Sequence, residues 1–194
     1  RQQGIIRVAS IEELVETANL LARCPLPGGD GFGLCTLSGG LCGMYADLCH
    51  QCGLSVPSLA PATVARLKAL LPDFAQPDNP LDLTGAGFFH GMDAILEALI
   101  DDPNLDIIAP LTIPPAHADD ALAHNLNSAV LGLMTSSPKP LVPIAFREVG
   151  DHARAYYQDH GVPCIEHAEL GFKAIAHLME YAAFQRRIKA GAED

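Results

Sequence analysis

Short apolar runs alternate with longer amphipathic stretches along most of the chain. Five runs are apolar on consecutive positions: residues 31–37, 54–56, 105–112, 141–146 and 162–165. Such runs are typical of strands that are buried on both faces of a parallel sheet. Between them, apolar residues recur at helical spacing, which predicts helices over residues 39–51, 61–71, 91–100, 116–134, 149–159 and 168–189.

The alternation predicts an α/β fold. Five strands joined by helices fit a flavodoxin-like three-layer sandwich, with a five-stranded parallel sheet in the order 2-1-3-4-5. The longest apolar run, Ile107 to Ile113, contains Pro110 and falls short of the ~18–20 residues that a membrane span requires. It is therefore interpreted as a buried strand, and no membrane partner is expected.

The first 29 residues differ from the rest. Ser10 and Glu13 form a capping box that predicts the start of a helix, and the prolines and glycines of residues 25–29 end it. We therefore divide the chain into a docking helix with its linker, residues 1–29, and a flavodoxin-like domain, residues 30–194. The apolar face of this helix needs a partner, either its own domain or a neighbouring one. The chain begins Arg1-Gln2-Gln3, without methionine or a signal peptide, and we expect a fragment of a longer protein.

Composition narrows the class of protein. The formal net charge is −11, which argues against nucleic acid and anionic membrane surfaces as partners. Hydrophobic residues make up 49% of the chain, enough for a packed core, so the six cysteines are expected to be reduced thiols in a cytoplasmic protein. Cys49 and Cys52 also suggest redox or zinc chemistry, but they lie at the end of a predicted helix and no second pair has zinc-site spacing. No metal site is expected.

A candidate anion site follows the first predicted strand. Ser38, Gly39 and Gly40 open a helix, where free backbone N–H groups and the helix dipole favour negative charge. The glycines allow close approach, and the Ser38 hydroxyl can donate a further hydrogen bond. The alternative is a tight strand-to-helix turn without a ligand.

A second polar loop is expected to face this turn, because ligands of parallel sheets bind where the strand order reverses. It contains Asn79, Asp82, Thr84 and Gly85, in a segment whose prolines exclude a helix. Asp82 is expected to hold the loop by accepting backbone N–H bonds, because its charge repels phosphate. Ordinary turn chemistry is the alternative for the whole cluster. His90 lies just beyond and is a further candidate site residue.

Several of these motifs together resemble one family. Gln3–Val8 and Ile11–Leu14 match its entry segment, and Asn79–Gly85 matches its NPxDLTG motif. Further matches are Gly39-Gly40, Asp47, Gly53-Leu54 and Asp101-Asp102-Pro103. From Gln3 to about Ile165 the chain resembles the CoA-ligase, flavodoxin-like domain of ADP-forming acyl-CoA synthetases, relatives of succinyl-CoA synthetase.

The resemblance implies a function. In the family, acyl-CoA cleavage is coupled to nucleotide phosphorylation through a phosphohistidine, which two helix N-termini cradle, and the turn at Ser38–Gly40 would supply one of them. The Ser-His-Thr-Gly loop that carries the family's histidine does not occur here, so no catalytic residue is assigned to this chain. CoA, ATP or ADP, and Mg would act in the full-length enzyme on CoA-binding, phosphohistidine and ATP-grasp domains outside this chain. None is expected to bind this fragment tightly, and the fragment alone is expected to be inactive.

The sequence also departs from the family and leaves alternatives open. Leu41-Cys42 follow the glycine pair where the family often has Pro-Gly, which tightens the turn. In some relatives the same domains are fused to an acetyltransferase and serve as a regulatory sensor of acyl-CoA or nucleotide. A flavin-binding module is a third alternative, which the lack of Trp and the 6% aromatic content disfavour. A homo-oligomer remains open.

Overall fold

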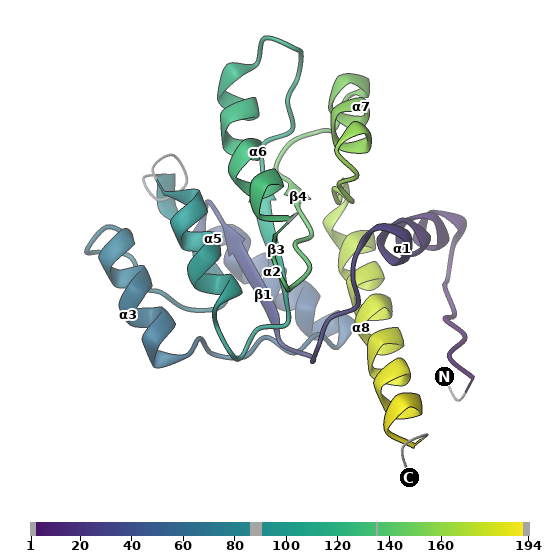
Figure 1. The fold of residues 1–194 in the computed structure, drawn as a ribbon. Helices are drawn as coiled ribbons and strands as arrows, with labels where there is room; N and C mark the ends of the chain where they lie inside the picture. Colours follow the sequence, from purple (N-terminus) through teal and green to yellow (C-terminus); the bar gives the residue numbers. More distant parts are fainter. Residues whose placement is uncertain (1–2, 86–90, 135, 192–194) are drawn as a thin grey trace.

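A computed structural model of the chain describes residues 3–85, 91–134 and 136–191. Within these residues a parallel sheet has four strands in the order β2-β1-β3-β4, and helices pack on both of its faces (Figure 1). The strands are β1 Phe32–Thr36, β2 Leu81–Asp82, β3 Ile107–Thr112 and β4 Ile144–Ala145. The predicted α/β class and the parallel arrangement are confirmed.

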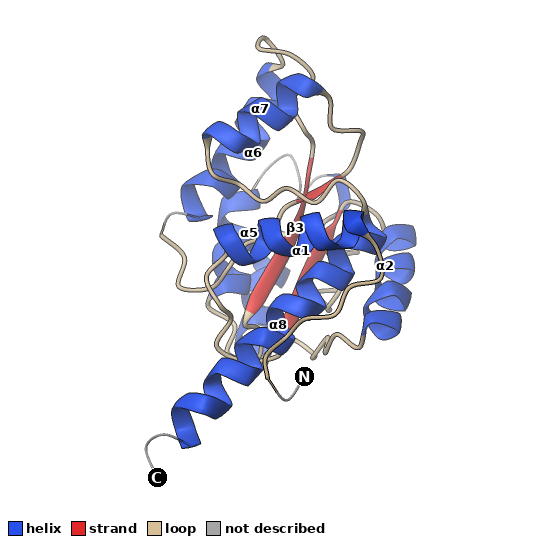
Figure 2. Ribbon diagram, turned by 90° about the vertical axis from the view of Figure 1, so that its right-hand side faces the viewer, coloured by secondary structure: helices blue, strands red, loops and turns tan. Residues whose placement is uncertain are grey.

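Among the described residues, seven helices surround this sheet, as Figure 2 shows from a second side. They are α1 Ile11–Arg23, α2 Gly39–Cys52, α3 Pro61–Leu70, α5 Met92–Ile100, α6 Ala121–Met134, α7 Asp151–Asp159 and α8 Ala168–Gly191. One core cluster joins α2 and α8 to one face of the sheet, and another joins α3, α5 and α6 to the opposite face. Helix α7 packs against α6 at the β4 side. Among the described helices, none combines the length and apolar character that crossing a membrane demands.

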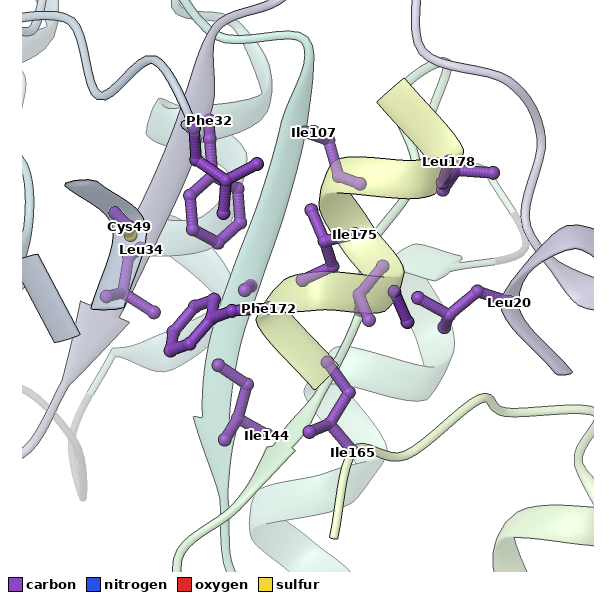
Figure 3. Close-up of a cluster of buried hydrophobic side chains, with 14 of the residues drawn as sticks. Leu20, Phe32, Leu34, Cys49, Ile107, Ile144, Ile165, Phe172, Ile175 and Leu178 are labelled. Carbon is purple, nitrogen blue, oxygen red and sulfur yellow. The ribbon is translucent and has the colours of Figure 1, made fainter. Parts of the chain in front are cut away.

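The larger core cluster lies between β1, β3 and α8 (Figure 3). Phe32 and Leu34 of β1 alternate in sequence with Gly33 and Cys35, so they point to the α8 side. There the ring of Phe172 meets that of Phe32 edge to face, with 5.8 Å between centroids. Burial of a large apolar side chain of this kind stabilises the fold by roughly 1.5–3 kcal/mol.

Five strands were expected, and two of the expected strands are reduced to single bridges. Residues 54–56 touch the sheet only where Ser55 pairs with Gly31, and Pro57 follows immediately. Residues 162–165 touch it only where Ile165 pairs with Ile144. The reason is the same in both places, because a proline has no N–H to donate to the next step of a ladder and Pro163 stands within the second segment.

The place beside β1 is instead taken by β2, in a segment that the sequence analysis interpreted as a loop. Leu81 pairs with Cys35 and Asp82 with Thr36.

The helix boundaries follow local capping. Ser10 Oγ accepts a hydrogen bond from the Glu13 N–H (3.1 Å), as expected of an N-cap, and Gly53 ends α2 with φ +70°. Helix α6 begins five residues later than predicted. Asp120 accepts hydrogen bonds from the N–H groups of Ala116 and Ala123, which keeps the preceding segment as a loop and caps the helix.

Candidate anion-binding site

The turn after β1 is held by a buried hydroxyl. Thr36 Oγ1 donates a hydrogen bond to the Ser38 carbonyl (3.0 Å) and accepts one from the Ser38 N–H (3.1 Å). Thr36 is fully buried and Ser38 is exposed, so these two bonds are partly buried. They fix Ser38 in an extended conformation (φ −153°), from which α2 begins with a bond from the Cys42 N–H to the Ser38 carbonyl.

The start of α2 is open to solvent. Ser38, Gly39 and Gly40 are all exposed, and the Ser38 side chain makes no capping hydrogen bond. The first N–H groups of a helix have no partner inside it, and the dipole of a 14-residue helix adds partial positive charge at the same place. The turn therefore presents backbone donors and an uncommitted hydroxyl toward solvent, an arrangement suited to an anion.

The second polar loop lies directly beside this turn, as the sequence analysis expected. Thr36 and Asp82 are partners in the register of β1 and β2, so the carboxyl ends of the two strands are adjacent. A Cβ atom placed on Gly39 would lie 3.3 Å from Asp82 Oδ2. Residues 38–40 and 82–85 thus form one surface at the end of the sheet.

The Asn79 side chain lies away from the turn and forms hydrogen bonds with the backbone of β1. Its Oδ1 accepts a hydrogen bond from the Leu34 N–H (3.1 Å), and its Nδ2 donates to the carbonyls of Phe32 (2.8 Å) and Pro57 (2.9 Å). These contacts fill the edge of β1 between the Ser55 bridge and β2. Asn79 is therefore a supporting residue of the loop, with both amide protons already committed.

Asp82 has one oxygen committed and one facing the turn. Its Oδ1 accepts a hydrogen bond from the Thr84 N–H (2.9 Å), while Oδ2 is the oxygen near Gly39. Thr84 has φ +55°, and its buried Oγ1 has no hydrogen-bond partner among the residues that the structure describes. The Asp82 carboxylate orders the loop, and its negative charge weakens the attraction of the turn for an anion.

The remaining candidate residues, His90, Gly85 and the cysteines, add no binding group to this surface in the part of the chain that the structure describes. His90 lies outside the described residues, and Gly85 is exposed at their edge. All six cysteines are unpaired, and burial raises the pKa of Cys35 and of Cys49 to about 12. Within the described part of the chain, no three His, Cys, Asp or Glu side chains gather as a metal site would require. The chemistry that this surface offers is therefore the binding of an anion by backbone donors.

Two features of this surface were not predicted from the sequence: the role of the Thr36 hydroxyl and the strand pairing of Asp82. Thr36 was assigned only to a buried strand, yet its hydroxyl shapes the turn, and Cys42 Sγ lies 3.5 Å from it. The signal was present, because a Thr two residues before a helix N-cap is placed to bond the backbone of the N-cap residue. The strand pairing of Asp82 carried no comparable signal.

Comparison with known proteins identifies ADP-forming acetate–CoA ligases among the relatives of this chain. The chain is 34% identical over 119 residues to an ADP-forming acetate–CoA ligase I of Archaeoglobus fulgidus, a match that covers 61% of this chain and 17% of that protein. It is 25% identical over 195 residues to the alpha subunit of ADP-forming acetate–CoA ligase I of Pyrococcus furiosus. This match covers 97% of this chain and 41% of that protein. No protein-family model matches the chain.

A solved structure agrees in fold. The dinucleotide-forming acetyl-coenzyme A synthetase 1 of Ca. Korarchaeum cryptofilum, in complex with phosphate and ADP, superposes with a TM-score of 0.76 at 20% identity, over 98% of this chain and 41% of that one. The chain is thus similar in sequence to ADP-forming acetate–CoA ligases. It spans less than half the length of these relatives.

Proposed function

We propose that this chain is one domain of an ADP-forming acyl-CoA synthetase, and that its turn at Ser38–Gly40 receives the phosphoryl group carried by a histidine of another domain. The homology supports the reaction class. The observation that carries the role of the turn is the exposed start of α2, with its free backbone donors, beside the end of β2. CoA, ATP or ADP and Mg would be held by domains outside this chain.

In this proposal some groups of the site bind the phosphoryl oxygens, and other residues position those groups. The N–H groups at the start of α2 and the Ser38 hydroxyl would bind phosphoryl oxygens, because each donates without adding a charged side chain. Thr36 would keep the donors in place through its bonds to Ser38. Asp82 would limit the affinity, so that inorganic phosphate does not stay bound between turnovers.

The experiment uses the full-length protein that contains this chain, assayed for ATP formation from acetyl-CoA, ADP and phosphate. A Gly40→Asp variant adds a carboxylate at the helix start, where it repels the anion, and should raise the KM for phosphate at least tenfold. The Asp82→Asn variant removes a charge and keeps the Oδ1 acceptor, so it should lower that KM by about threefold to tenfold. Opposite shifts from the two variants would support a phosphoryl site at this turn.

Gly132→Asp is the matched control, because it adds the same charge at an exposed glycine of α6 with open space around it. If it shifts the KM for phosphate as much as Gly40→Asp does, the proposed role of the turn is wrong. If the protein binds acetyl-CoA but forms neither ATP nor phosphorylated histidine, a regulatory sensor replaces the catalytic proposal.

A further inference from the structure

Helix α1 carries most of its apolar residues on the side that faces solvent. Its buried positions include Glu13 (6% exposed), Thr17 (3%) and Leu20 (0%). The opposite side carries large apolar side chains that are strongly exposed, together with two exposed alanines. We call this set the α1 stripe: Ile11 (75% exposed), Leu14 (52%), Val15 (60%), Ala18 and Ala22.

The spacing places the stripe on one line. Positions i, i+3, i+4, i+7 and i+11 of a helix share one face, so the five side chains form a continuous strip along α1. Figure 2 shows α1 lying in front of α8, on the side of the molecule turned toward the viewer. A contiguous apolar surface of this kind on a folded domain marks an interaction site.

Contacts with α8 fix this orientation. Glu13 Oε1 lies 2.8 Å from His177 Nε2 of α8, and Leu20 belongs to the core cluster that contains Phe172 and Leu178. Rotating α1 to bury the stripe would break the Glu13–His177 contact and expose Leu20. The outward stripe is therefore a consequence of how the domain packs.

We propose that the α1 stripe binds the α1 stripe of a second copy of this chain, with the two helices antiparallel around a two-fold axis. The stripe is large at its beginning and small at its end. A two-fold axis near the middle of α1 would set Ile11 opposite the partner's Ala22 and Val15 opposite the partner's Ala18. Large against small side chains let two helices approach to about 8–10 Å, and an isologous contact of this kind closes as a dimer.

Charge at the edges of the stripe favours the same arrangement. Glu12 and Arg23 are exposed on the same flank of α1, at opposite ends, and neither forms an ion pair within the part of the chain that the structure describes. The two-fold axis brings Glu12 beside the partner's Arg23, and the reverse, so both contacts join opposite charges. A parallel two-fold pair would instead place this flank on opposite edges of the interface in the two copies, so that Glu12 would not meet the partner's Arg23.

The size of the stripe sets the expected strength. Helix α1 has 13 residues and is about 20 Å long, so one helix pair buries less than the roughly 800 Å² per partner of a standard interface. We therefore expect a monomer–dimer equilibrium that depends on concentration, and not a permanent dimer.

Sedimentation equilibrium of the chain measures this directly. Between about 5 and about 500 µM the weight-average mass should rise from 20.5 kDa toward twice that value. Val15→Glu places a charge at the centre of the stripe and should keep the chain monomeric throughout. Phe74→Glu is the matched control, because Phe74 (75% exposed) is, like Val15, a strongly exposed apolar residue but lies outside α1. This control should dimerise as the unmodified chain does.

A charge exchange tests the antiparallel geometry. Glu12→Arg alone, or Arg23→Glu alone, should weaken the dimer at least threefold, and the double variant should restore it, because both cross-partner pairs are then opposite in charge again. Far-ultraviolet circular dichroism verifies that every variant stays folded.

Each of the following results would overturn the proposal: a monomer at about 500 µM, equal effects of Val15→Glu and Phe74→Glu, or no recovery in the double variant. A stripe that is protected from solvent only in a longer protein, against another of its domains, would also overturn it. The proposal does not depend on the phosphoryl role of the Ser38–Gly40 turn.

Discussion

The Asn79 side chain completes the edge of β1 by binding Leu34, 45 residues earlier in the sequence. The Leu34 N–H donates to Asn79 Oδ1 over 3.1 Å, and the Asn79 Nδ2 group donates to two further carbonyls. A side-chain amide has the same donor and acceptor groups as a peptide unit, so it can substitute for a missing strand residue. This substitution ties the loop that carries Asp82 to the strand that leads to Ser38.

Replacing Asn79 by Ala should destabilise the fold. It leaves the Leu34 N–H and the Phe32 and Pro57 carbonyls without these partners, and an unsatisfied buried group costs about 1–3 kcal/mol. We expect a loss of about 2–3 kcal/mol in the free energy of unfolding, measured by urea denaturation.

Asn104→Ala is the control for this substitution. Asn104 is exposed, and its side chain donates one hydrogen bond to the Ser58 carbonyl, so its loss should cost under about 1 kcal/mol. Equal losses from the two variants would contradict the strand-completing role of Asn79.

Thr36→Val should loosen the turn before α2 while keeping the volume of the side chain. The change removes both hydrogen bonds to Ser38 from a buried position, which should cost about 1–3 kcal/mol of unfolding free energy. If the turn holds a phosphoryl group, the KM for phosphate of the full-length enzyme rises as well.

The conservative variant Thr36→Ser separates the hydroxyl from the methyl group. It keeps the donor and acceptor, so the KM for phosphate should stay close to that of the unmodified protein. A KM that rises equally in Thr36→Ser and Thr36→Val would show that the hydroxyl bonds are not what positions the turn.

Asp120 should make stability depend on acid pH. Backbone N–H donation from Ala116 and the Arg147 guanidinium lower the pKa of Asp120 to about 2. A carboxyl whose pKa is lowered by folding stabilises the fold at any pH above its ordinary pKa of about 3.9. This contribution is lost as the pH falls through the folded-state pKa of about 2. The Asp120→Asn variant should therefore be less stable than the unmodified chain at pH 6, with a gap that closes between about pH 4 and pH 2.

Asp119→Asn provides the comparison for this pH dependence, because the Asp119 side chain is 89% exposed and lies next to Asp120 in sequence. Its stability should follow that of the unmodified chain over the same pH range, in thermal unfolding followed by circular dichroism. A gap for Asp120→Asn that persists unchanged at pH 2 would mean that its charge is not the stabilising feature.

The sequence by itself determined the class of fold and the helix limits that depend on local groups. Apolar runs identified β1 and β3, and Ser10 and Gly53 marked where α1 begins and α2 ends. These features depend on neighbours a few residues apart, or on burial over a whole segment, and both are visible in a linear pattern.

Only the tertiary structure decided which segments complete the sheet and which face of α1 is outward. Leu81–Asp82 takes the place expected for residues 54–56, because Asn79 supplies the groups that join it to β1. The stripe faces solvent because Glu13 and Leu20 contact α8, more than 150 residues away in sequence for the Glu13–His177 pair. Such long-range contacts compete with local apolar preference, and their balance is set only when the whole chain has folded.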